Sequence, residues 1–408
     1  MAKAYSAAPW PHFDDEQIEA AAQVLRSGKV NYWTGTQGRE FEREFAEFTG
    51  VKHAIWLANG TVALELALRS LNLLQGSEVI TTPRTFIASS SAIVAAGLTP
   101  VFADIDPDTG NITPVTAAPL INERTSAILV VHLGGWPADM PSFRELCDAH
   151  SLALIEDCAQ AHGAKIGNRH VGSFGDVAAW SFCQDKIITT AGEGGMVATN
   201  DDAKWRWMWA YKDHGKSWEA VYEREHAPGF RWLHESFGTN WRGTEMQAAI
   251  GRVQYRRLPA WQARRERNAR VLADRLSRVH GLRVPMPTAD ITHAFYRLYA
   301  YVDLDALAPG WDRDRIVAEV AARHRVPVFS GSCSEIYRER AFIDAGLAPT
   351  QPLPVASAMT ETALAFLVHP GLTSRDMAIV GDAVAGVMVE ATGLTATHTG
   401  VGEIPSEY

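Results

Sequence analysis

Short apolar runs and helical patterns alternate along the chain from about Val51 to Thr199. AIWLANG is followed by TVALELALRSLNLL and EVITT by SSSAIVAAG, and later apolar runs stand in TPVFADID, SAILVVHLGG and LALIEDCAQAHG. This alternation is typical of a mostly parallel β-sheet with helices on both faces. In that architecture ligands bind at the carboxyl ends of the strands, so the polar residues after each apolar run are the candidates for a functional site.

The second half of the chain predicts a long helix and a smaller α/β unit. Residues 244–279 are helical in character, with an interruption near Pro259 and several arginines, which we interpret as a solvated helix linking two domains rather than a nucleic-acid surface. FYRLYAYVDL, DRDRIVAEVAARH and PVFSGSC then predict a strand, a helix and a strand. We expect a large domain over residues 1–260, a small one over 261–395 and a mobile tail over 396–408.

Composition argues against several classes of protein. The formal net charge of −9 gives no overall attraction to nucleic acid. Four cysteines without paired or metal-like spacing favour a reducing compartment, so we expect a cytoplasmic protein. No stretch approaches the roughly 20 apolar residues of a membrane span. The histidines show no HxxxH or HxH spacing, and we expect no metal site.

Two polar positions after apolar runs could carry chemistry. The run Ala153–Asp157 ends in two acids, and a carboxylate there could hold the ring nitrogen of a bound heterocycle protonated. A cap on the next turn is an equally good interpretation of Asp157. Lys186 lies between an apolar run and a Gly-rich turn, where partial burial could let its amine act as a nucleophile. An isolated lysine is normally a surface charge, so its neighbours must decide.

A phosphate site is the third candidate. Asn59, Gly60 and Thr61 separate an apolar run from a helical pattern, and a small-residue turn that opens a helix presents free N–H groups. Taken alone, Thr61 is better interpreted as a helix N-cap. Ser181 could add a hydroxyl to the same phosphate, and Phe86 could stack on a cofactor ring, although aromatic residues in such places are more often core.

Eight segments, in order along the chain, resemble the DegT/DnrJ/EryC1/StrS family of pyridoxal-phosphate (PLP)-dependent nucleotide-sugar aminotransferases. They are NYWTGTQGREFEREFAEFTG at 31–50, NGTVALELAL at 59–68, TPRTFIAS at 82–89, PVFADID at 100–106, HLGGWPADM at 132–140, IEDCAQAHGA at 155–164, SFCQDKIITTAGEGGMVATND at 181–201 and GTNWRGTEMQAAIG at 238–251.

The resemblance implies an α/β protein of the PLP-dependent transferase fold type I, which is aspartate-aminotransferase-like. Its large domain holds a mostly parallel seven-stranded sheet, beside a smaller α/β C-terminal domain. Matched position by position, Lys186 would be the Schiff-base lysine and Asp157 the partner of the pyridinium nitrogen. Gln160 would lie near the ring and its phenolic oxygen, and Phe86 would stack on the ring. The phosphate would be held by Gly60, Thr61 and Ser181.

The same resemblance implies a homodimer with two shared active sites. Asn240 would reach the phosphate of the neighbouring subunit's cofactor, and Trp33, Thr34 and Arg242 match positions near the substrate. The chain departs from the family pattern at Asn59, where Ser is frequent, and in FCQDK before the lysine. The small domain matches loosely, and with residues 214–237 it would shape the sugar pocket.

The implied reaction moves an amino group from an amino acid, L-glutamate by analogy, to a keto group on a nucleotide-linked deoxysugar. GEGGM at 192–196 resembles members that aminate C4 of the sugar more than those that act at C3. Two alternatives stay open. One is a PLP-dependent sugar dehydratase, in which histidine replaces the lysine. The other is a non-catalytic regulatory or binding protein of the same fold.

Overall fold

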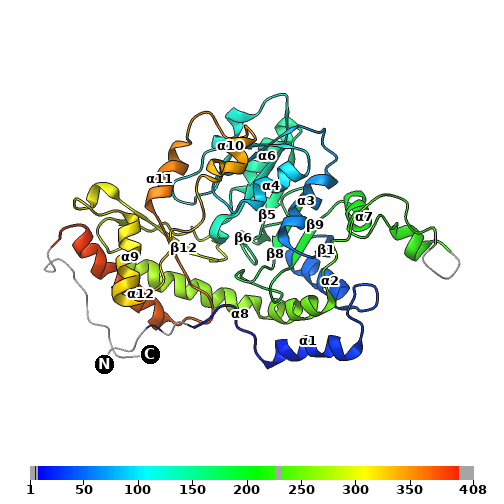
Figure 1. The fold of residues 1–408 in the computed structure, drawn as a ribbon, viewed down its shortest axis with the longest axis horizontal. Helices are drawn as coiled ribbons and strands as arrows, with labels where there is room; N and C mark the ends of the chain where they lie inside the picture. Colours follow the sequence, from blue (N-terminus) through cyan, green and yellow to red (C-terminus); the bar gives the residue numbers. More distant parts are fainter. Residues whose placement is uncertain (1–4, 6–7, 226–230, 395–408) are drawn as a thin grey trace.

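A seven-stranded sheet forms the centre of the computed structural model, which describes residues 5, 8–225 and 231–394 (Figure 1). All neighbouring strands pair in parallel except at β9, which is antiparallel to both of its neighbours. The predicted mostly parallel seven-stranded sheet is therefore confirmed. In spatial order the strands are β1 (His53–Leu57), β9 (Gly195–Thr199), β8 (Val177–Ser181), β5 (Ala153–Asp157), β4 (Thr125–Val131), β2 (Glu78–Thr81) and β3 (Thr99–Phe102).

Helices cover both faces of this sheet because alternate strand residues point to opposite sides. In β1, Ile55 and Leu57 belong to one buried cluster, whereas Trp56 between them belongs to another. The first cluster includes residues of α3 (Gly60–Ser70), α4 (Ala88–Ala95) and α7 (Asp202–Tyr211). The second includes residues of α2 (Gln37–Thr49) and α8 (Glu245–Leu276), and α6 (Met140–His150) contributes to a further cluster with β4 and β5.

Helix α8 runs unbroken for 32 residues beneath the sheet, so the expected interruption near Pro259 is wrong (Figure 1). The helix begins with a capping box between Thr244 and Gln247. Most of the stability of a helix in a protein comes from tertiary packing. Contacts with α1 (Asp15–Ser27), α2 and α12 (Ser374–Ala391) hold α8 together across the exposed proline.

The arginines of α8 are largely used within the molecule. Arg256 and Arg257 pair with acids at the start of α1, and Arg270 pairs with Glu266 one turn away. Arg265 is buried. These contacts show a helix packed against α1 rather than the solvated linker that we expected, and the preference against a nucleic-acid surface stays a prediction.

The C-terminal part of the chain forms a second buried core over a small antiparallel sheet. Its strands are β10 (Leu282–Arg283), β12 (Leu298–Val302) and β13 (Ala363–Phe366), with α9 (Arg313–His324) and α12 packed on them. The strand expected in PVFSGSC is wrong, because this stretch contributes only a bridge between Phe329 and Ala365 before Gly331 turns the chain at φ 83°. The strand that pairs with β12 at this edge of the sheet is β13.

The shorter elements complete the described chain. They are α5 (Pro114–Ala117), α10 (Arg340–Asp344), α11 (Pro354–Thr362) and a sheet of β6 (Lys165–Ile166), β7 (Arg169–His170) and β11 (Ile291–Thr292). The predicted domain boundary after residue 260 falls inside α8, and the division itself stays a prediction. The tail predicted over 396–408 lies outside the described residues.

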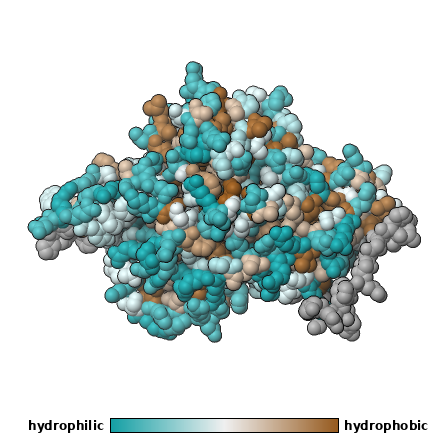
Figure 2. All heavy atoms as spheres, turned by 180° about the vertical axis from the view of Figure 1, so that it is seen from behind, coloured by the Kyte–Doolittle hydropathy of each residue, from teal (hydrophilic) through white to brown (hydrophobic). Residues whose placement is uncertain are grey.

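One face of the molecule is mostly hydrophilic (Figure 2). Figure 2 shows hydrophobic residues on one face as separate patches among hydrophilic ones rather than as a continuous band. Among the helices of the described residues, none is both long enough and apolar enough to cross a membrane.

Candidate active site

A cavity of about 1080 Å³ opens at the carboxyl ends of β1, β2, β5 and β8. Its volume lies just above the range of about 300 to 1,000 Å³ that is usual for small-molecule sites. This is the edge where the fold class predicts a ligand. Seven residues proposed from the sequence line it, namely Gly60, Thr61, Phe86, Asp157, Gln160, Ser181 and Lys186.

One corner of the cavity is the N-terminus of α3. Asn59 caps this helix by accepting a hydrogen bond of 3.0 Å from the N–H of Val62, so Thr61 is not the N-cap that we favoured from the motif alone. A Cβ at Gly60 would lie 2.6 Å from Cβ of Ser181, which explains the glycine. The close approach places the Ser181 hydroxyl beside the helix start, where N–H groups and the helix dipole favour an anion.

Asp157 ends β5 at the wall of the cavity. Its side chain accepts hydrogen bonds from Ser89 Oγ at 2.7 Å and from the N–H of Ala159 at 3.0 Å. The second bond closes the local turn, as the capping interpretation predicted, and the role of Asp157 towards a ring nitrogen stays a prediction. Burial raises the pKa of Asp157, and the hydrogen bond from Ser89 opposes that effect. A cation brought into the cavity would relieve the cost of keeping this carboxylate ionised.

Lys186 lies in the loop between β8 and β9 and has a side chain only 15% exposed. Its Nζ is 3.7 Å from Oδ1 of Asp185 and 5.0 Å from the ring centroid of Tyr296. Burial raises the pKa of Asp185, but Lys186, the Tyr296 hydroxyl and Arg297 lower it overall. The amine therefore lies at the cavity wall, beside Asp185 and Tyr296, instead of extending into solvent.

Gln160 and Phe86 complete the wall. Oε1 of Gln160 accepts a hydrogen bond of 2.7 Å from the N–H of Gly134, which fixes the amide and leaves its NH₂ group to point elsewhere. Phe86 is 68% exposed, so the alternative that it belongs to the core is wrong. An exposed aromatic ring at the mouth of a cavity is suited to stacking on a flat ligand.

Four other residues proposed from the sequence do not line this cavity. Asn240 is exposed and bridges to Asp213. Arg242 pairs with the same Asp213, whereas Trp33 lies 4.1 Å below Nζ of Lys216. The Thr34 hydroxyl donates to the carbonyl of Asn31 at 3.1 Å. Within one chain the structure does not bring these residues to Lys186.

The cavity also has walls that the sequence reasoning missed. Ser89 contacts Asp157, and the start of the small antiparallel sheet supplies Tyr296, Arg297 and Tyr299. Tyr296 and Arg297 both contact Asp185, next to Lys186. The signal in the sequence was the run FYRLY, in which polar and aromatic residues interrupt a strand pattern.

A buried group of potential metal ligands lies behind the site, formed by His132, Glu156 and Cys158. Nδ1 of His132 accepts from the N–H of Ala138, and Nε2 faces Glu156 at 3.2 Å. Both oxygens of Glu156 accept hydrogen bonds from backbone N–H groups of the 172–175 turn. The ligand atoms of His132 and Glu156 are therefore engaged in holding the backbone of neighbouring loops.

Comparison with known proteins supports the resemblance. The model of the DegT/DnrJ/EryC1/StrS aminotransferase family matches residues 11–385. The chain belongs to this family. A GDP-perosamine synthase of Caulobacter vibrioides is 37% identical over 391 residues, which cover 92% of this chain and 100% of that protein. A UDP-N-acetyl-3-dehydro-alpha-D-glucosamine 3-aminotransferase of Acidithiobacillus ferrooxidans is 39% identical over 69% of this chain and 73% of its own.

A solved aminotransferase from Psychrobacter cryohalolentis has 54% sequence identity and a TM-score of 0.92, covering 94% of this chain and 99% of its own. The fold is thus that of the DegT/DnrJ/EryC1/StrS aminotransferases, fold type I, as expected, and the protein is a PLP-dependent aminotransferase. The cavity fits this cofactor. It offers a helix N-terminus with a serine hydroxyl for a phosphate, a buried carboxylate for a ring cation, an exposed aromatic ring for stacking and an amine for an aldehyde.

Proposed function

We propose that this enzyme transfers an amino group from an amino acid, with L-glutamate favoured, to the C4 keto group of a nucleotide-linked deoxysugar. The observation that carries the proposal is the meeting of Lys186, Asp157 and the start of α3 in one cavity. The two relatives named above, which act on UDP- and GDP-linked sugars by their names, support the substrate class.

In this proposal each residue has a defined task. Gly60, Thr61 and Ser181 hold the phosphate, Asp157 keeps the ring nitrogen protonated, and Gln160 and Phe86 orient the ring. When bound, PLP supplies an electron sink for the substrate carbon that loses or gains the amino group. Lys186 binds the cofactor covalently and, once displaced, its amine moves the proton at that carbon, a role that typically contributes a factor of about 10² to 10⁴.

The lysine assignment is tested by spectroscopy. The purified enzyme should show the visible absorption of lysine-bound PLP, and L-glutamate should shift that band to the pyridoxamine form. Lys186→Ala should lose both the covalent link, seen by borohydride trapping and mass spectrometry, and turnover. The matched control is Lys29→Ala, which replaces an exposed lysine. A Lys186→Ala protein that still traps PLP and turns over would reject the assignment, and a wild-type band that ignores all amino acids would favour the regulatory alternative.

The choice of C4 rests on the GEGGM sequence at 192–196 and needs its own test. Keto-sugars carrying the keto group at C3 or C4, on UDP, GDP and dTDP, would be supplied with glutamate or glutamine as the donor. Product identification by NMR gives the aminated carbon. We expect amination at C4 with glutamate, and a product aminated at C3 or a preference for glutamine would overturn the finer part of the proposal. A deoxygenated product without nitrogen would identify a dehydratase.

We further propose a cytoplasmic homodimer in which Asn240, Trp33, Thr34 and Arg242 act at the partner's site. Their position away from the cavity of their own chain supports this. Mixing inactive Lys186→Ala and Asn240→Ala subunits would test it, because a shared-site dimer leaves one intact site in each mixed dimer. About a quarter of all sites should then recover. No recovery after verified subunit exchange would contradict sharing.

A further inference from the structure

The N-terminal segment, residues 8–17, connects three separate parts of the molecule. Ala8 packs against the core of the C-terminal unit, Trp10 lies on α8, and the buried Gln17 bonds to Gln254 of α8, which in turn contacts the loop that carries Lys186. This segment contributes no residue to the cavity wall, and the proposed chemistry does not use it.

Trp10 touches the lysine directly. Its indole N–H donates a hydrogen bond of 2.9 Å to the backbone carbonyl of Lys186, across 176 positions of sequence. Residues 182–194 between β8 and β9 form no helix or strand, so the loop is held by hydrogen bonds within it, such as that from the Lys186 N–H to the Cys183 carbonyl, and by bonds from outside it. A bond to the carbonyl of Lys186 restrains the backbone from which its side chain projects.

The indole ring is itself held on three sides. Trp261 of α8 meets it edge to face at 5.2 Å, and His369 stacks on it at 5.6 Å with an interplanar angle of 24°. The guanidinium of Arg265, also on α8, lies 5.0 Å from the ring centroid. Because α8 and the C-terminal unit fix the ring, its N–H is aimed at the loop rather than free to rotate away.

A second link holds the loop three residues later. The N–H of Thr189 donates to Oε1 of Gln254 at 2.8 Å, and Nε2 of Gln254 donates to Oε1 of Gln17 at 2.7 Å. Both glutamines are buried. Their path leads from the lysine loop through α8 to the first turn of α1.

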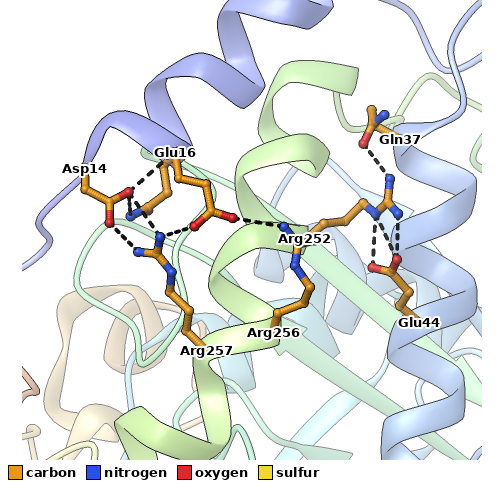
Figure 3. Close-up of polar contacts among 8 residues, drawn as sticks. Asp14, Glu16, Gln37, Glu44, Arg252, Arg256 and Arg257 are labelled. Atoms are coloured by element: carbon orange, nitrogen blue, oxygen red, sulfur yellow. Dashed lines mark hydrogen bonds and ion pairs between the residues drawn. The ribbon is translucent and has the colours of Figure 1, made fainter.

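Ion pairs lock that first turn to α8. Figure 3 shows Asp14 and Glu16 reaching down to Arg256 and Arg257. Asp14 also accepts from Nε2 of Gln17 at 3.2 Å, which orients the glutamine toward α8. The start of α1 and Trp10 therefore restrain the lysine loop at two points, one at Lys186 and one at Thr189.

From these contacts we infer that Trp10 is a positioning residue for Lys186. Its N–H fixes the backbone of the lysine and thereby the direction from which the amine approaches the cofactor. The inference rests on the proposed role of Lys186. It matters because displacements of about 1 Å at a reacting group can cost on the order of 100-fold in rate.

The test removes the N–H and keeps the ring. Trp10→Phe removes the N–H but puts a smaller aromatic ring in place of the indole. A benzothienylalanine at position 10, with sulfur in place of the N–H, removes it and keeps nearly the same shape. The control is Trp311→Phe, another half-buried tryptophan, which lies in the C-terminal unit without a described contact to the lysine loop. All proteins are compared loaded with PLP.

Two measurements are made on each protein. The first is hydrogen exchange at the amides of Lys186, Thr189 and Thr190, which bond to Cys183, Gln254 and Phe182. Losing one hydrogen bond should speed this exchange about twofold to tenfold in both position-10 variants. The second is the pH midpoint at which the absorption of the lysine-bound cofactor titrates, which should move in the same variants. Trp311→Phe should change neither.

Each other outcome overturns the inference. Unchanged exchange in the benzothienylalanine protein would show that the N–H restrains nothing. Faster exchange with an unmoved titration midpoint would reduce Trp10 to a structural contact, as would equal effects of Trp311→Phe. If the lysine assignment itself is wrong, Lys186→Ala will still trap PLP, which is a separate observation. The exchange result does not depend on that chemistry.

Discussion

The Ser89 hydroxyl donates a 2.7 Å hydrogen bond to Oδ2 of Asp157, 68 positions further along the chain. Because an ionised carboxylate can only accept, the neighbouring Thr85 hydroxyl, 2.8 Å from Ser89 Oγ, must in turn donate to the serine. All three side chains are buried. This chain of hydroxyls stabilises the charged form of Asp157 against the effect of its burial.

Replacing Ser89 by Ala should therefore weaken the hold on PLP. Without this donor the pKa of Asp157 rises further and its charge is less available to the ring nitrogen. Hydrogen bonds to charged groups contribute about 1.5 to 3 kcal/mol, so the Kd for PLP should rise roughly tenfold or more. Equilibrium titration of the apoenzyme with PLP measures it.

Ser90 offers a matched control for this prediction. It is the next residue on the same helix and equally buried, but its hydroxyl has no hydrogen-bond partner within the described residues. Ser90→Ala should bind PLP as the wild type does. Equal losses in the two variants would mean that the effect comes from helix packing and not from the carboxylate.

Replacing Arg297 by Ala should raise the KM for the amino-acid donor. Lys186 and Arg297 are the two cations on the described cavity wall, and both lie against the carboxylate of Asp185. A donor whose amino group reaches the lysine's place brings its carboxylate close to that guanidinium. Losing a charge-assisted pair should raise the KM by about tenfold to 100-fold and change kcat less.

Steady-state kinetics with separate variation of donor and sugar substrate would check this. Arg297→Lys should fall between the two, since lysine keeps the charge and loses the paired geometry. Arg340→Ala, whose side chain is 91% exposed and outside the cavity, should leave both KM values unchanged. An unchanged donor KM in Arg297→Ala would exclude the pairing.

The sheet could be predicted from sequence because a parallel strand is buried on both faces and therefore appears in the sequence as an apolar run. The two errors in the predicted elements, the break at Pro259 and the strand in PVFSGSC, have a common physical cause. Pro259 should break a helix by its local effects, yet packing against α1 and α12 keeps α8 intact. PVFSGSC has strand propensity, but β13 supplies the pairing edge instead. In both places tertiary contacts outweigh local preference.

The site was predictable only where it follows the strands. Asp157, Ser181 and Lys186 stand directly after or near apolar runs, so topology alone brings them together. Tyr296 and Arg297 come from the other unit, and their place depends on how α8 sets that unit against the sheet. No spacing in the sequence encodes that docking. The same holds for Trp10, whose hydrogen bond to Lys186 joins two residues that are 176 positions apart in the sequence.

Replacing Gly60 by Ala should disturb the phosphate corner. The new Cβ would lie 2.6 Å from Cβ and 3.1 Å from Cα of Ser181, so the first turn of α3 must shift. Overpacking of this kind costs about 1 to 3 kcal/mol, and the N–H groups at the helix start would move with it. We expect a lower free energy of unfolding and a higher Kd for PLP.

A glycine in open space provides the comparison for this change. Gly386 lies inside α12, is exposed, and has nothing within 4 Å of a built Cβ. Gly386→Ala should raise the free energy of unfolding by about 0.5 to 1 kcal/mol and leave PLP binding unchanged. Urea unfolding with and without PLP measures both. A Gly60→Ala protein that behaves like Gly386→Ala would show that the corner is not closely packed.

His293 should make the protein less stable in mild acid. Burial lowers its pKa from 6.5 to about 3, and its Nδ1 accepts a hydrogen bond of 2.7 Å from the N–H of Phe295, which requires that nitrogen to be unprotonated. Between pH 6.5 and about 3 the unfolded chain binds a proton that the folded protein excludes. Stability is therefore complete above pH 6.5 and falls as the pH drops, by on the order of 1 to 2 kcal/mol at pH 5.

Urea unfolding at pH 7, 6 and 5, at fixed protein and PLP concentrations, would isolate this contribution. Asn in place of His293 can still accept the backbone hydrogen bond but does not titrate, so the loss between pH 7 and 5 should shrink. It should not vanish, because burial also lowers the pKa of His162 and His369 to about 3. His324→Asn, at the exposed end of α9, should keep the wild-type slope. If His293→Asn kept it too, the imidazole would have to be protonated in the folded state, and its bond to Phe295 could not be the one described.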